Sequence, residues 1–209
     1  MPVPTSGLVL HYDLDSYVSG NIPDASGNGH DGVITSGSVS GGVLLLGNGY
    51  VTPQIPPVAV PAMTLSVWLQ MTDGQCCVWS SSGSAAYAGL LQSSTAASYT
   101  GGSGQAYWVD GVNVGLLNRQ DLAAAIADGN PHHFVYTVSS GGGGIWAGTW
   151  YFGKYAQLTS FNTNGESWGH RVYDRVLSDS EIGDLFGEFG AGASTRRRRE
   201  AQRKIGGPF

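Results

Sequence analysis

The chain has 209 residues, of which 41% are hydrophobic and only 12% are charged, so its composition excludes an intrinsically disordered protein and suits one packed domain. The 33 glycines follow no collagen-like period and predict instead a fold that is rich in turns. No apolar run is long enough to span a membrane, and the first residues resemble no secretory signal, so we expect synthesis in the cytoplasm.

Charge is divided unevenly along the chain, whose formal net charge is −5. Four basic and fourteen acidic side chains precede residue 196, which gives a balance of −10. Six basic side chains and one acidic side chain follow, which gives a balance of +5. This contrast, together with the Gly/Ala-rich stretch before it, predicts a domain over residues 1–189 and a linker with a basic tail over residues 190–209.

Alternating apolar and polar residues predict β-strands along most of the chain. The first strand is predicted over residues 8–15, where Leu10 and Tyr12 share one face and Asp13 and Asp15 share the other. The other predicted strands lie at residues 30–35, 42–52, 65–71, 76–81, 86–92, 106–110, 112–117, 134–138, 145–152 and 168–176. Asn-Gly and Asp-Gly pairs between them favour tight hairpin turns. The pattern indicates an all-β fold, a two-sheet antiparallel jelly-roll sandwich.

Two short helices are predicted within this pattern. Asn118 is a suitable N-cap for a helix over residues 119–127. Ser178 and Glu181 have the spacing of a capping box and precede an apolar stretch near the end of the domain. We expect both helices to lie at the edges of the sandwich.

The adjacent cysteines Cys76 and Cys77 are the only two in the chain. Neighbours on a strand point to opposite faces, so an ordinary disulfide between them is disfavoured. We expect two reduced thiols, one of them buried. By the same geometry His132 and His133 cannot share one metal ion, and we expect one of the two rings to be buried.

Three segments together resemble the laminin-G-like (LamG) members of the concanavalin A-like superfamily. The first joins residues 7–15, GLVLHYDLD, to residues 24–32, DASGNGHDG, and is similar to the opening strand and glycine-rich loop of that family. Residues 128–136, DGNPHHFVY, are similar to its strand entry, and residues 171–182, RVYDRVLSDSEI, to its closing strand and helix. In this order the resemblance covers residues 7–188.

The resemblance implies a jelly roll whose first and last strands pair. Many relatives hold a structural calcium ion in the glycine-rich loop, which would use Asp24, Asn28 and Asp31 in this chain. Residues 168–170, WGH, stand where relatives often carry an acidic pair. A turn without metal is therefore the simpler alternative, and we expect no cofactor. Family members include lectins, adhesion domains, glucanases and phage-particle proteins, so the fold selects no function.

The positions of the acidic residues in the sequence argue against a glycosidase. A glycosidase needs two convergent carboxylates, and the four glutamates form no E-x-D-x-E pattern. Asp13 and Asp15 are predicted on one strand face, but we interpret them as a solvated strand edge. We therefore expect a protein that is not an enzyme, with a glucanase ranked last among the alternatives.

Aromatic residues near turns are the candidates for stacking on a sugar ring or anchoring a partner. They are Trp108, Trp146, Trp150 and Tyr151. The candidate partner-docking residues lie in the tail and are Arg196, Arg197, Arg198, Arg199, Arg203 and Lys204. The negative charge of the domain disfavours nucleic acid, and no aromatic residue lies among the arginines to stack on bases.

The leading hypothesis from these features is a non-catalytic structural or adhesive subunit of a larger assembly. It would be a capsid-decorating or tail-associated protein of a phage virion, made in the host cytoplasm and docked on a capsid or tail protein through its basic tail. The alternative is a carbohydrate-binding lectin module, which could be extracellular and would bind surface glycans. The sequence leaves open whether the chain forms a homo-oligomer.

Overall fold

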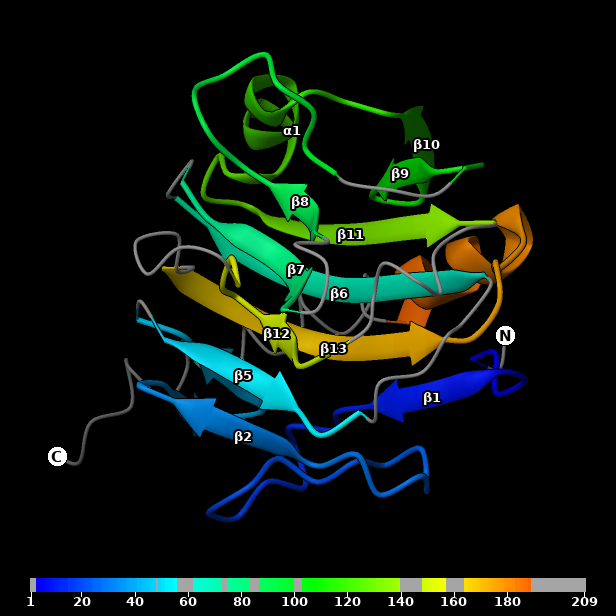
Figure 1. Ribbon diagram of the computed structural model, residues 1–209. Coiled ribbons are helices and arrows are strands. Elements are labelled where there is room, and N and C mark those ends of the chain that lie inside the picture. The colour runs from blue at the N-terminus through cyan, green and yellow to red at the C-terminus, as the bar shows by residue number, and fades with distance from the viewer. Residues whose placement is uncertain are drawn as a thin grey trace, which may run out of the picture.

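The computed structural model describes residues 3–47, 49–55, 62–72, 75–82, 87–99, 103–139, 148–156 and 164–188. These residues form two antiparallel sheets that pack face to face, with the smaller sheet in front of the larger one in Figure 1. The predicted all-β, two-sheet sandwich with two helices is confirmed. The predicted tail, including all six of its basic residues, lies outside the described residues. No described helix is long and apolar enough to cross a membrane.

The larger sheet has eight described strands in the order β10-β9-β11-β6-β13-β4-β3, with β1 paired to β13. Their bounds are β1 Leu8–His11, β3 Ser38–Ser40, β4 Val43–Leu45, β6 Met63–Met71, β9 Ala106–Val109, β10 Val112–Gly115, β11 Pro131–Val138 and β13 Gly165–Tyr173. The antiparallel pairing of β1 with β13 confirms that the first and last strands are neighbours.

The smaller sheet has five described strands in the order β2-β5-β12-β7-β8. Their bounds are β2 Gly32–Thr35, β5 Tyr50–Pro53, β7 Cys77–Ser81, β8 Tyr87–Leu90 and β12 Trp150–Phe152. Helix α1, Arg119–Ile126, starts at the predicted cap, where the side chain of Asn118 accepts a hydrogen bond from the Asp121 backbone N–H. The second helix covers residues 179–188.

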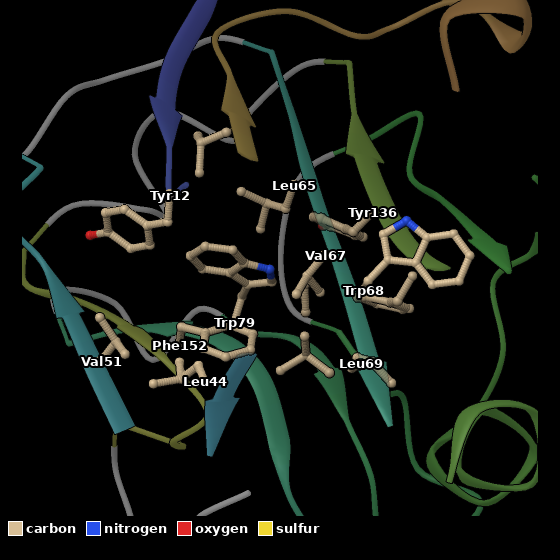
Figure 2. Close-up of a cluster of buried hydrophobic side chains, with 14 of the residues drawn as sticks. Tyr12, Leu44, Val51, Leu65, Val67, Trp68, Leu69, Trp79, Tyr136 and Phe152 are labelled. Carbon is tan, nitrogen blue, oxygen red and sulfur yellow. The ribbon is translucent and has the colours of Figure 1, made fainter. Parts of the chain in front are cut away.

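The core lies between the two sheets. Figure 2 shows Leu65, Val67 and Leu69 on one side of β6, where Trp79 and Phe152 of the smaller sheet meet them. Burying one such side chain stabilises the fold by about 1.5–3 kcal/mol, so this alternation fixes which face of each strand points inward. Trp68 leaves β6 on the opposite side (Figure 2).

The second helix packs on the outer face of the larger sheet, so the expectation that it lies at an edge of the sandwich is wrong. Phe186 from this helix stacks on Trp68, with ring centroids 5.6 Å apart, and Trp68 stacks in turn on Trp168 at 6.0 Å. Arg171 of β13 is ion-paired with Glu188 at 2.9 Å. The predicted capping box is confirmed, because the Ser178 backbone N–H donates to Glu181 and the Glu181 N–H donates to the Ser178 hydroxyl.

A bulge in β13 divides the residues that follow Trp168 between the two faces. The pairing with β6 shifts between Trp168 and Arg171, and Gly169 supplies the positive φ of +62° within this irregularity. As a result His170 points into the core, where its ring meets the Phe152 ring edge-on at 4.3 Å. Trp168 and Arg171 both lie on the face of the larger sheet against which the second helix packs.

Two predicted strands differ from the structure. The strand predicted over residues 8–15 ends at His11, and Asp13 lies in a turn where its carboxylate accepts a hydrogen bond from the Asp15 N–H. The segment predicted as one strand over residues 42–52 is two strands in different sheets. They are separated because Gly47 has a φ of +49° and the Gly49 N–H bonds back to the Leu46 carbonyl.

The histidines are expected to make stability depend on pH in two opposite ways. Burial lowers the pKa of both His133 and His170 from 6.5 to about 3. The unfolded chain therefore binds protons that the folded chain does not bind as the pH falls from 6.5 to 3, and the free energy of unfolding declines in that window. Partial burial opposes a charge on His132, but hydrogen bonds to Asp110 and Asp128 outweigh it and raise its pKa.

Because the folded pKa of His132 is raised, its contribution to stability is complete below pH 6.5 and is lost as the pH rises through the folded pKa. We predict that His132→Gln removes this alkaline decline and keeps the acidic one, as measured by urea unfolding across pH. Titration of the ring signals by NMR provides the independent check. A protonated His133 or His170 ring in the folded protein at pH 6 would contradict the assignment.

Candidate functional site

Tyr151 is held on the outer face of the smaller sheet by its two neighbours in β12. Trp150 and Phe152 are each only 1% exposed and pack in the core, so the residue between them must point outward, where it is half-buried. Tyr50 has the same position in β5, next to the fully buried Val51. Because Phe152 pairs with Val51, the two tyrosines are diagonal neighbours, and their ring centroids lie 5.8 Å apart.

Lys154 lies over both tyrosine rings. Its Nζ atom is 4.4 Å from the Tyr50 centroid and 5.0 Å from the Tyr151 centroid, within the range of a cation–π interaction. The backbone here is fixed by Ser80 of β7, whose hydroxyl donates to the Lys154 carbonyl and accepts from the Ala156 N–H. The ammonium group is therefore held at the corner between two aromatic rings.

A second aromatic pair continues this surface toward β8 and α1. The rings of Tyr155 and Tyr87 meet edge-on at 5.3 Å, and the Arg119 guanidinium lies 5.7 Å from the Tyr87 centroid. Arg119 also donates a hydrogen bond to the Tyr87 hydroxyl at 3.1 Å. Burial and, to a smaller extent, the neighbouring Tyr87 raise the pKa of Tyr155. Tyr50, Tyr87, Tyr151, Tyr155, Lys154 and Arg119 are called the tyrosine face below.

The tyrosine face combines the groups that recognise sugars. Tyrosine rings offer rigid apolar surface for the C–H groups of a pyranose or furanose ring, and their hydroxyls donate and accept hydrogen bonds. The two cations can bind polar or anionic substituents. The second helix packs on the outer face of the larger sheet. On the outer side of the smaller sheet, by contrast, four residues remain partly exposed, which are Tyr50, Tyr151, Lys154 and Tyr155.

The structure separates the aromatic residues that the sequence singled out. Trp108 is 7% exposed because the second helix packs over it through Ile182 and Leu185. Trp150 is buried in the main core, so neither indole is available to stack on a sugar. Tyr151 belongs to the tyrosine face, and Trp146 lies outside the described residues. Sequence reasoning missed the other five residues of the tyrosine face, which are Tyr50, Tyr87, Arg119, Lys154 and Tyr155.

Cys76 and Cys77 are both buried. The expectation of only one buried thiol is wrong because the outer face of the smaller sheet is covered at this point. Cys76 packs in the main core. Cys77 packs with Tyr87 and Leu90, against which Tyr155 lies. The tyrosine face thus rests on an apolar layer of its own.

The glycine-rich loop that was the candidate calcium site contains a network of hydrogen bonds in the structure. The Asp24 carboxylate accepts from the backbone N–H groups of His11, Ser26 and His30, at 2.9–3.0 Å, and from the Ser26 hydroxyl at 2.8 Å. Asp31 accepts from the Asp24 N–H. Burial opposes the charge on Asp24, but these hydrogen bonds lower its pKa overall.

Asn28 completes this loop by donating to the carbonyls of Leu8 and Val9 in β1. The three candidate calcium ligands, Asp24, Asn28 and Asp31, are therefore brought together, and their observed role is to fasten the loop to the first strand. Within the described ranges, no group of three or more His, Cys, Asp or Glu residues could hold a metal ion. The expectation of a turn without metal, with calcium as the alternative, stays a prediction.

The fold matches solved structures at low sequence identity, whereas no protein-family model and no curated protein matches the chain. One match is the receptor-binding domain of a botulinum neurotoxin C/D mosaic serotype, with 10% identity, a TM-score of 0.56, and coverage of 88% of this chain and 52% of that domain. This chain thus spans about half the length of that toxin domain.

Domain 4 of AbnA, an arabinanase from Geobacillus stearothermophilus, matches over nearly its whole length. Its TM-score is 0.54 at 15% identity, with coverage of 86% of this chain and 98% of that domain. A sialidase of Trypanosoma rangeli matches with a TM-score of 0.52 at 16% identity, over 88% of this chain and 33% of the sialidase. These similarities show that the chain shares a β-sandwich fold with these domains.

We predict that Asp24→Asn lowers the free energy of unfolding by about 2–4 kcal/mol, because an amide cannot accept all four hydrogen bonds that the charged carboxylate accepts. Urea unfolding in the presence of a calcium chelator provides the measurement. Asp13→Asn, in a more exposed turn, is the matched control and should cost less than about 1 kcal/mol. A loss of stability for Asp24→Asn that appears only when calcium is added would contradict the structural role.

Proposed function

We propose that the chain is a carbohydrate-binding, lectin-like module that binds its ligand on the tyrosine face. The observation that carries this proposal is the pairing of two partly exposed tyrosine rings, Tyr50 and Tyr151, with Lys154 between them on the outer face of the smaller sheet. This arrangement costs little conformational entropy on binding, because both rings are already positioned by buried neighbours in their strands.

Solved domains with this fold support the proposal. Domain 4 of AbnA is described in complex with arabinotriose, and the binding domain of botulinum neurotoxin DC in complex with SialylT. The same toxin domain is also described in complex with rat synaptotagmin II, so this fold serves protein binding as well. A LamG-type assignment of this chain, from the three sequence segments, fits both uses.

The proposed module acts by binding, without catalysis. Asp13 and Asp15 form a turn, in which the Asp13 carboxylate accepts the Asp15 N–H at 3.1 Å. That geometry differs from the pair of carboxylates converging from two sides on one bond that glycoside hydrolysis requires. Turnover of a glucan that disappears in Asp13→Asn would contradict this part of the proposal.

Replacing Tyr151 tests the glycan site. We predict that Tyr151→Ala weakens binding of a glycan ligand by about tenfold, because it removes an aromatic stacking surface worth about 1–1.5 kcal/mol. Tyr151→Phe is the matched control and should keep most of the affinity, since it retains the ring. Glycan-array screening followed by calorimetry provides the measurement, with thermal unfolding to show that each variant is folded. Equal affinities of Tyr151→Ala and the unaltered chain would exclude this face.

A second candidate function is favoured by the charge contrast between residues 1–195 and the last fourteen residues. In this proposal the chain is a structural or adhesive subunit of an assembly such as a phage virion, docked through Arg196–Arg199, Arg203 and Lys204 on an acidic protein surface. Both functions are compatible, because the tyrosine face and the tail are different parts of the chain.

We predict that a chain ending at Ala193 keeps the far-ultraviolet circular dichroism and cooperative unfolding of the sandwich but no longer joins the assembly. Co-purification with intact particles provides the measurement. A full-length chain with the four consecutive arginines replaced by lysine should still be incorporated, since the charge is kept. Normal incorporation of the truncated chain would exclude docking through the tail.

A further inference from the structure

We propose that the tyrosine face selects glycans that carry a carboxylate group, and that Lys154 supplies the charge that recognises it. This inference rests on the carbohydrate-binding function proposed above and adds the class of ligand. It follows from where the cations of the domain lie, from how they are held, and from the charge of the remaining surface.

Only four basic residues precede residue 196, and the structure describes all of them. Arg171 is ion-paired with Glu188, and Arg175 with Glu181. Among the described residues, Lys154 and Arg119 form no ion pair with a carboxylate. Both of these cations belong to the tyrosine face, so the positive charge that is not neutralised within the domain is gathered on one side of the sandwich.

Neither cation has its charge neutralised by a carboxylate among the described residues, so both can interact with an anionic ligand. Aromatic rings attract the Lys154 ammonium through their quadrupole without cancelling its charge, and they leave its N–H donors free to meet an oxygen. Arg119 donates to neutral acceptors, which are the Gln92 side chain at 2.7 Å and the Ala97 carbonyl at 2.9 Å. An anionic ligand on Tyr50 and Tyr151 would therefore meet a positioned Lys154 ammonium, which lowers the entropic cost of binding.

The tyrosine hydroxyls are compatible with an anion. A tyrosine hydroxyl is neutral at pH 7, so it can donate a hydrogen bond to a carboxylate and does not repel it. Residues 1–195 carry a balance of −10 with Lys154 and Arg119 included. The net charge of the domain therefore disfavours an anion, and these two cations offset that repulsion locally, which favours binding of an acidic sugar at the tyrosine face.

The test is a printed array of neutral, carboxylated and sulfated oligosaccharides, followed by calorimetry on the best carboxylated glycan and its carboxyl-reduced form. We expect the unaltered chain to prefer the carboxylated glycan by about tenfold, the effect of one charge-assisted hydrogen bond. Lys154→Gln should abolish this preference, whereas Lys154→Arg should keep most of it. The preference should weaken as salt is raised from 50 to about 500 mM.

A full-length variant with Arg196, Arg197, Arg198 and Arg199 replaced by glutamine separates the face from the tail. It should keep the preference for the carboxylated glycan, and a loss of that preference would overturn the inference by assigning it to the tail. Equal affinities for the carboxylated glycan and its carboxyl-reduced form, both lost in Tyr151→Ala, would leave carbohydrate binding intact and overturn the acidic class. Preference for sulfated over carboxylated glycans would also overturn it. No binding to any glycan on the array would overturn both proposals.

Discussion

The packing of Trp150 and Phe152 against the larger sheet is the constraint on which the surface of this protein depends. A strand that buries every second side chain must present the others on its opposite face. Tyr151 is therefore placed by the core, as is Tyr50 beside the buried Val51. The site needs no mobile loop to form, because the same hydrophobic burial that stabilises the sandwich also positions the tyrosine rings.

The two outer faces of the sandwich differ in exposure because the second helix packs on only one of them, that of the larger sheet. On the larger sheet, Phe186 stacks over Trp68, and Glu188 neutralises the buried Arg171. The aromatic residues there are structural, and they hold the helix in place. On the smaller sheet, tyrosines occupy the equivalent outward positions, where their hydroxyls can meet water while their rings cover Cys77 and Leu90. The outer face of the smaller sheet, which lacks such a helix, is the one proposed to bind a ligand.

Sequence periodicity predicted the fold well where strands are long and regular. The alternation in β6 and β11 identified two central strands, and the helix caps at Asn118 and Ser178 are confirmed by their hydrogen bonds. It failed where the backbone departs from regular pleating. The turn at Gly47, the irregular pairing of β1 and the bulge at Gly169 all depend on positive φ angles or on local hydrogen bonds that alternation does not report.

The candidate site was only partly predictable for a related reason. Tyr151 could be selected because it is an aromatic residue next to a turn, and alternation places it opposite Trp150. Tyr50 becomes its neighbour only through the pairing of β12 with β5, which joins segments far apart in the chain. The burial of Trp108 depends on the docking of a distant helix, so a tryptophan in the sequence could not be assigned to core or surface by its spacing alone.

The most direct measurement of the central claim is a backbone and aromatic NMR titration of the full chain with its best glycan from an array. The account predicts that the largest signal changes map to β5, β12 and residues 153–155, together with the rings of Tyr50 and Tyr151. Signals from the outer face of the larger sheet, including Trp68 and Trp168, should change little. Changes confined to the Asp24 loop or to the larger sheet would show that the tyrosines are structural and that the glycan binds elsewhere.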